Sequence, residues 1–158
     1  MLDSSVAGAV ADYAACIGTT GKDTPIVINN LDPPVVIPPT GAFIPDSGLS
    51  FSALTDGLSN TILVGEKHVP RGVDTLPPWD CSIFDGHNFT CNTRCAGPGF
   101  PLATSPLDMR LLFGGPHFGQ CLFAFADGAV RPVRNSTSEY TLGLLAHRSD
   151  GLPAPSDY

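Results

Sequence analysis

Basic side chains are scarce in this sequence. Lys and Arg together number 8, against 15 Asp and Glu, which gives a formal net charge of −7 and a pI near 4.7. A surface of this charge repels phosphate backbones and anionic membranes, and the few cations form no cluster. The composition therefore argues against a nucleic-acid-binding protein.

Long apolar runs are also missing. No stretch approaches the roughly 18 residues that indicate a membrane-spanning helix, so we expect no membrane span in this chain. The first residues, Met1, Leu2 and Asp3, lack the charged and apolar regions of a secretory signal peptide. If the protein is exported, we expect this chain to be a trimmed form or a fragment of a longer protein.

The sequence lacks the usual catalytic signatures. It has no phosphate-binding loop, no G-x-S-x-G elbow, no H-E-x-x-H motif and no G-x-G-x-x-G motif. Ser59 or Cys121 with His117 and Asp127 would make a nominal catalytic triad, but nothing in the sequence brings these side chains together. We therefore expect no enzyme, no catalytic residue and no cofactor.

Glutamate is nearly absent, because only Glu66 and Glu139 accompany thirteen Asp. Asp favours turns and caps over helix interiors, and 17 Gly and 16 Pro leave little room for long helices. The chain of 158 residues has the length of one domain. We predict a single mainly β or α+β domain over residues 1–158, with an antiparallel sheet, long Pro/Gly-rich loops and a short C-terminal helix.

Several segments have readable patterns. Residues 6–17 could be a short helix or a strand, residues 61–64 read as a buried strand, and residues 111–113 read as a short strand. Residues 25–46 contain two Pro pairs and predict an extended loop with edge strands. Residues 70–108 predict a long irregular excursion that needs covalent staples.

The C-terminal third carries the clearest signals. Residues 120–126 and 129–134 predict a hairpin around Asp127-Gly128, which suits a two-residue type I′ turn, and Pro132 makes the second strand an edge or bulged strand. Residues 136–148 predict a helix with Ser136 and Glu139 as its capping box. Its apolar face would comprise Leu142, Leu145 and Ala146, and its last turn would hold His147 and Arg148.

Five cysteines are present, and their scatter favours an oxidising compartment. A Cys81–Cys91 disulfide would staple the 70–108 excursion, with Cys91–Cys95 as its rival. A zinc site built from His87, Cys81, Cys91 and Cys95 is a weaker alternative, because a second well-spaced ligand pair is lacking. Calcium at the four Asp-Gly pairs is also weaker, because turn formation explains each pair and none has EF-hand spacing. We predict no bound metal.

Two blocks of the sequence resemble a known family. Gly114-Gly115-Pro116-His117, nine residues and then Asp127-Gly128 resemble the H-x9-DG motif, and the block TDGLSNTILVGE at residues 55–66 has a family counterpart. Asp12-Tyr13-Ala14 and residues 147–151 also fit. The family is prepilin-like, abundant in planctomycetes and called domain of unknown function 1559; it also carries a solute-binding label. The chain departs from the family pattern at Pro116, which precedes the histidine, and at Ala129, which replaces serine.

The resemblance implies the C-terminal globular part of a longer prepilin-like protein, without its N-terminal helix. It implies a pilin- or pseudopilin-like ectodomain, extracytoplasmic at the cell surface or secreted, with other pilin-like subunits or cell-envelope components as partners. A Cys16–Cys121 disulfide is a further pairing, because both residues lie in family-like blocks. The motif residues would have structural roles: Asp56, Gly57, Ser59, Asn60, Glu66, His117, Asp127 and Gly128.

Among these residues, His117 is expected to be a buried imidazole that bonds backbone groups. The alternative function is an extracellular solute- or glycan-binding module. Such a module would use exposed aromatic side chains near a cleft, and the candidates are Trp79, Tyr13 and Tyr158.

Overall fold

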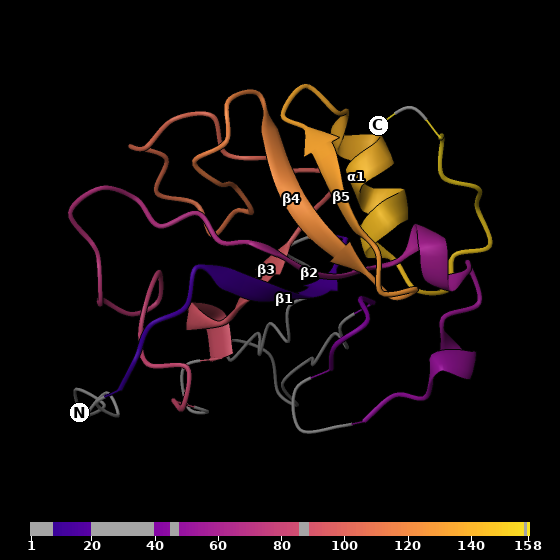
Figure 1. The fold of residues 1–158 in the computed structure, drawn as a ribbon, viewed down its shortest axis with the longest axis horizontal. Coiled ribbons are helices and arrows are strands. Elements are labelled where there is room, and N and C mark those ends of the chain that lie inside the picture. The colour runs from indigo at the N-terminus through magenta and orange to yellow at the C-terminus, as the bar shows by residue number, and fades with distance from the viewer. Residues whose placement is uncertain (1–7, 20–39, 45–47, 86–88, 157) are drawn as a thin grey trace, which may run out of the picture.

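A computed structural model describes residues 8–19, 40–44, 48–85, 89–156 and 158. Within them lies a five-stranded sheet in the order β3-β1-β2-β4-β5 (Figure 1). The strands are β1 (Tyr13–Gly18), β2 (Ile62–Glu66), β3 (Thr93–Cys95), β4 (Gln120–Phe125) and β5 (Val130–Arg134). The β1–β3 pair is parallel and the other pairs are antiparallel. The mainly β, α+β fold class is therefore confirmed.

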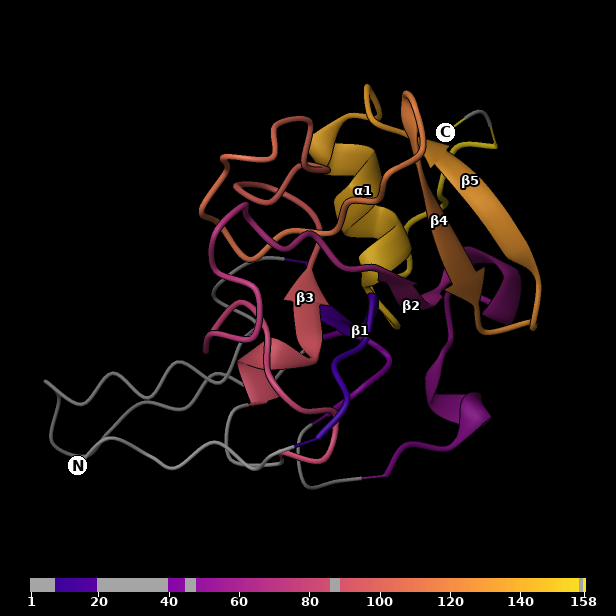
Figure 2. The ribbon, with the colours of Figure 1, turned by 60° about the vertical axis from the view of Figure 1, so that its left-hand side comes forward.

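One α-helix, α1 (Glu139–Ala146), lies in the described part of the chain, together with three short 3-10 turns. These turns are η1 (Phe51–Ala53), η2 (Leu58–Asn60) and η3 (Phe89–Cys91). α1 lies against the sheet (Figure 2), and the predicted apolar residues Leu142, Leu145 and Ala146 join a buried cluster with Phe113, Phe123 and Phe125. Within the described ranges, no helix has the length and apolar character needed to cross a membrane.

Of the ambiguous segment 6–17, the part from Tyr13 onward lies in strand β1, and the expected strand over residues 61–64 corresponds to β2. The expected loop over residues 25–46 lies largely outside the described residues. Residues 111–113 do not form a strand, and only an isolated bridge joins Phe113 to Lys67. The His68 N–H to Leu112 O bond belongs to this bridge, but the pairing goes no further, because the Leu112 N–H donates to Arg110 O and the His68 carbonyl accepts the Arg94 side chain.

The predicted hairpin is present as β4 and β5, with Leu122 opposite Pro132, and β5 is an edge strand as Pro132 predicted. The turn type was wrong. Gly128 has a φ of 84°, but Asp127 is not among the described non-glycine residues with positive φ. Gly128 N–H donates to Phe125 O, and Phe125 N–H donates to Ala129 O. The loop is thus a three-residue turn in which only Gly128 needs the left-handed conformation.

The predicted helix cap was also wrong. Ser138, not Ser136, is the N-cap, and its hydroxyl accepts the Thr141 N–H at 3.1 Å. Glu139 occupies the first helical turn, and its carboxylate accepts the Gly99 N–H at 2.7 Å, so it does not form a capping box. His147 is the C-cap, so the helix ends earlier than predicted.

Candidate functional site

Glu66 stands where strand β2 ends and connects three parts of the molecule. The β2–β4 ladder reaches Gly65 opposite Phe123, and the next β4 donor, the Leu122 N–H, is accepted by Glu66 Oε2 at 2.7 Å. Glu66 Oε1 lies 3.1 Å from His117 Nε2. The side chain thus extends the sheet by one bond and links it to the loop of residues 114–117.

The two glycines of this loop are required by how closely it approaches Ala103 and Glu66, since a Cβ at Gly114 would lie 2.8 Å from the Ala103 Cβ. Gly114 N–H donates to Glu66 O at 2.9 Å. A Cβ at Gly115 would lie 2.1 Å from Glu66 Oε2, closer than any real contact. The Gly-Gly sequence therefore follows from packing, since a side chain at position 114 would collide with Ala103 and one at position 115 would displace the buried carboxylate.

His117 does not match the predicted buried imidazole that bonds backbone groups. Its side chain is 45% exposed, and its nearest charged partner is the Glu66 carboxylate. The backbone of the 114–117 loop is already bonded to β2 through Gly114, so the imidazole lies across the loop and reaches the carboxylate instead. This geometry keeps His117 as an anchor between loop and sheet, but places it at the surface.

Asp56 and Gly57 join the turn before β2 to the segment after α1. The Asp56 carboxylate accepts the N–H groups of Asp150 and Gly151 at 2.7 and 2.8 Å. Gly57 has a φ of 101°, a conformation that favours glycine, and Asn60 Nδ2 donates to Asp56 O at 3.0 Å. The motif turn is therefore held by bonds to residues almost a hundred positions away.

Asp127 anchors the hairpin turn. Its carboxylate accepts the Ala129 N–H and pairs with Arg131, and these two contacts lower the pKa of the Asp127 carboxyl group. Arg131 also donates to Ser59 O at 3.1 Å and lies 4.6 Å from the centre of the Phe125 ring. Arg131 thus contacts both Ser59 and Asp127, and it connects η2 to the hairpin.

The nominal triad is not assembled. Asp127 lies beyond the C-terminal end of β4, bonded to Arg131, whereas His117 lies before its N-terminal end, beside Glu66. Cys121 is buried, and its Sγ contacts the backbone oxygen of Glu66 at 3.9 Å. Burial, together with the charge of Glu66, raises the pKa of the Cys121 thiol far above its ordinary value, so the reactive thiolate is disfavoured.

Asp56, His147 and Asp150 offer ligand atoms that lie within 4.8 Å of one another. Each of these groups already has a donor from the protein. Asp56 accepts two N–H groups, Asp150 Oδ1 accepts the Leu152 N–H, and His147 Nδ1 accepts the Ser149 N–H. His147 and Asp150 bond within their own turn, whereas Asp56 bonds across to Asp150 and Gly151, so the local turn formation that the sequence predicted accounts for only some of these bonds.

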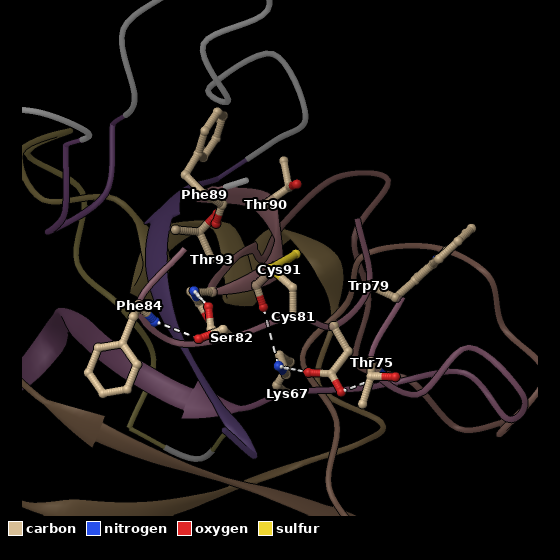
Figure 3. Close-up of a disulfide and its surroundings, with 12 residues drawn as sticks. Lys67, Thr75, Trp79, Cys81, Ser82, Phe84, Phe89, Thr90, Cys91 and Thr93 are labelled. Carbon is tan, nitrogen blue, oxygen red and sulfur yellow. Dashed lines mark hydrogen bonds and ion pairs between the residues drawn. A yellow bond between two sulfur atoms is a disulfide. The ribbon is translucent and has the colours of Figure 1, made fainter. Parts of the chain in front are cut away.

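Cys81 and Cys91 form a disulfide within the 70–108 excursion (Figure 3). This is the staple that the sequence predicted, and it contradicts the Cys91–Cys95 rival and a zinc site that uses Cys81 and Cys91. The Cys16–Cys121 pairing is also wrong, since Cys16 Sγ contacts Ala146 O and Cys121 Sγ contacts Glu66 O. Cys16, Cys95 and Cys121 are buried, and His87 lies outside the described residues.

A buried ion pair lies beside the disulfide. Lys67 Nζ donates to Asp80 Oδ1 at 2.7 Å and to Cys91 O at 3.2 Å, and its side chain is fully buried (Figure 3). Asp80 Oδ2 accepts the Thr75 N–H at 3.0 Å. These contacts connect the end of β2 to both ends of the disulfide-closed segment, since Asp80 precedes Cys81 and the other acceptor is Cys91 O, and no sequence pattern indicated them.

Arg94 in β3 is a second buried cation that the sequence analysis missed. Burial lowers its pKa to about 10, so it remains charged at neutral pH, and the charge of Asp80 opposes this shift. Its guanidinium donates to five backbone carbonyls, those of His68, Trp79, Thr90, Thr93 and Leu112. One side chain therefore bonds the carbonyls of several separate segments, most of them irregular, and holds them together.

Three adjoining hollows surround the 114–117 loop, with volumes of about 350, 410 and 470 Å³. All three are lined by Gly114 and Gly115, and the larger two also by His117. We call them together the 114–117 furrow. Of the three aromatic residues considered for binding, only Tyr13 lines it, whereas Trp79 donates to Met109 O and Tyr158 stacks on Phe125.

The fold and these contacts define a mainly β domain with a disulfide-stapled excursion and motif residues that cross-link its loops. Residues 36–96 match the model of a family described as protein of unknown function (DUF1559). The match includes the block at residues 55–66 and ends before His117 and Asp127. No curated protein and no solved structure matches the chain.

Proposed function

We propose that the chain is a non-enzymatic, extracytoplasmic domain of a pilin- or pseudopilin-like protein with a structural or assembly role. The observation that carries this proposal is the use of the motif residues. Asp56, Glu66 and Asp127 each bond backbone N–H groups of another segment or their own turn. His117 contacts Glu66, so the motif side chains have partners within the protein and hold loops to the sheet.

Two further features support the proposal. The Cys81–Cys91 disulfide is compatible with an oxidising compartment outside the cytoplasm. Cys121, a candidate nucleophile, is buried, and the pKa of its thiol is raised, which opposes covalent catalysis. The partners of such a domain would be other pilin-like subunits or components of the cell envelope.

The proposal is tested on the product of the natural gene in its own cells. We expect the protein in the membrane and in the fraction sheared from the cell surface, with an N-terminus generated by a prepilin-type peptidase. N-terminal sequencing of the sheared material measures this directly. Recovery of the protein only in the cytosolic fraction, with an unprocessed N-terminus, would contradict the proposal.

A second candidate function is an extracellular solute- or glycan-binding module. The observation that favours it is the 114–117 furrow, because a concave surface with convergent polar groups is the usual form of a small-molecule site. A structural surface domain can also bind a ligand, because Glu66 and His117 hold the 114–117 loop to the sheet and also line the furrow.

A further inference from the structure

We propose that the 114–117 furrow binds a neutral sugar chain, with Tyr13 and Phe118 as its two aromatic platforms. This inference rests on the second candidate function and names its site and ligand class. The two larger hollows, of about 410 and 470 Å³, fall within the range of roughly 300–1,000 Å³ that small-molecule sites span. Both are lined by Gly114, Gly115 and His117, so the two hollows adjoin one short loop, and a ligand of more than one ring is needed to occupy both.

The aromatic platforms stand one in each hollow. Tyr13 lines the first hollow and is 55% exposed, and Phe118 lines the second and is fully exposed. Neither ring packs into the core, although the domain buries other large aromatic side chains completely. An exposed ring face offers the flat apolar surface on which the apolar side of a pyranose ring can stack.

Both platforms are held in place by the framework. Tyr13 lies in β1 opposite Glu66. Phe118 lies between His117, which contacts Glu66, and Gly119, whose carbonyl accepts the Asn135 N–H at 2.9 Å. A ring on such a short, bonded loop loses little conformational freedom on binding, which favours affinity for a weakly interacting ligand.

Polar groups suited to hydroxyls border the rings. Asp12 lines the hollow of Tyr13, and Ser105 and the imidazole of His68 line the hollow of Phe118. In the same wall, Asn135 Oδ1 is buried and has no hydrogen-bond partner among the described residues. Carboxylate and amide oxygens accept hydrogen bonds from sugar hydroxyls, and charge-assisted bonds of this kind are the stronger ones.

Charge decides which sugars fit. Among the residues that the structure describes, Lys67 is the one lysine or arginine that lines the furrow, and it is buried and paired with Asp80. Asp12 and Asp74 also line the furrow, are exposed, and form no salt bridge with another described residue. An anionic polysaccharide would meet uncompensated negative charge, whereas a neutral chain would not. The lining therefore selects neutral sugars over acidic ones.

The test uses ¹⁵N-labelled protein titrated with cellopentaose, chitopentaose and maltopentaose, with penta-galacturonate and hexalysine as charged probes. We expect saturable chemical-shift changes around residues 114–119 with at least one neutral probe, and none there with galacturonate. Phe118→Ala and Tyr13→Ala should each raise the Kd by about tenfold, the loss of one stacking contact. Phe84→Ala, at another largely exposed ring in the disulfide-closed segment, should leave Kd unchanged.

The variants should keep the wild-type spectrum elsewhere, because both rings are exposed and removing them leaves the core intact. The proposal is overturned if no neutral probe shifts these resonances at millimolar concentration. It is equally overturned if the rings do not affect Kd, or if hexalysine binds the furrow more tightly than any sugar does. None of these results affects the cell fractionation test, so failure of the sugar site and failure of the pilin-like proposal are separate findings.

Discussion

Replacing Arg94 by methionine is expected to remove at least about 4 kcal/mol of unfolding free energy, which approaches the whole stability of many domains. The variant leaves five backbone carbonyls without their charged donor in a region that excludes water. Hydrogen bonds to charged groups contribute about 1.5–3 kcal/mol each, and methionine replaces none of them. Urea unfolding followed by circular dichroism measures the change.

Arg71→Met is the matched control, because Arg71 is an exposed arginine in the same excursion. We expect it to change stability by no more than about 0.5 kcal/mol. Arg94→Lys should fall between the two, since an ammonium has three donors and cannot reach five carbonyls in the planar arrangement of the guanidinium. Equal stabilities for Arg94→Met and Arg71→Met would show that the buried guanidinium does not hold the excursion together.

Replacing Lys67 by methionine is expected to cost about 3–5 kcal/mol, because it leaves the Asp80 carboxylate buried without its cation. The double variant Lys67→Met/Asp80→Leu removes both charges and should recover most of this loss, since an apolar pair of similar volume avoids the desolvation cost. A double-mutant cycle in urea, with the disulfide kept oxidised, gives the coupling energy.

The single variant Asp80→Leu completes the double-mutant cycle. It leaves the Lys67 ammonium buried beside Cys91 O without its carboxylate partner. Its cost should be similar to that of Lys67→Met. Strictly additive effects of the two single variants would contradict the ion pair, because they would mean that each side chain contributes without the other.

Much of the fold was predictable because its signals are local. A turn sequence between two apolar runs gave the β4–β5 hairpin, and the spacing of Leu142, Leu145 and Ala146 gave the buried face of α1. Details within these elements depended on tertiary contacts. Glu139 would suit a capping box with Ser136, but its carboxylate accepts the Gly99 N–H, and the N-cap is Ser138, two residues later, so that the helix begins at Glu139.

The candidate site was predictable only in part. The residue types of the motif blocks identified Asp56, Glu66 and Asp127, but not their partners. Leu122 and Gly151 donate to these carboxylates from 56 and 95 positions away, and no local pattern encodes such pairs. Arg94 was missed for the same reason, because its role comes from five carbonyls that only the folded excursion brings together.

The extracytoplasmic, structural role is tested most directly by the state of Cys81 and Cys91 in living cells. Cells of the natural source are precipitated with acid and dissolved in urea with N-ethylmaleimide, because both cysteines are buried in the folded protein, and the purified protein is then reduced and treated with iodoacetamide. Trypsin leaves both cysteines on residues 72–94, so a second cut before Asp85 separates them for mass spectrometry. An extracytoplasmic domain should carry carbamidomethyl groups on both cysteines, because the disulfide protects them from the first reagent. N-ethylmaleimide on both would show reduced thiols in the cell and contradict that role.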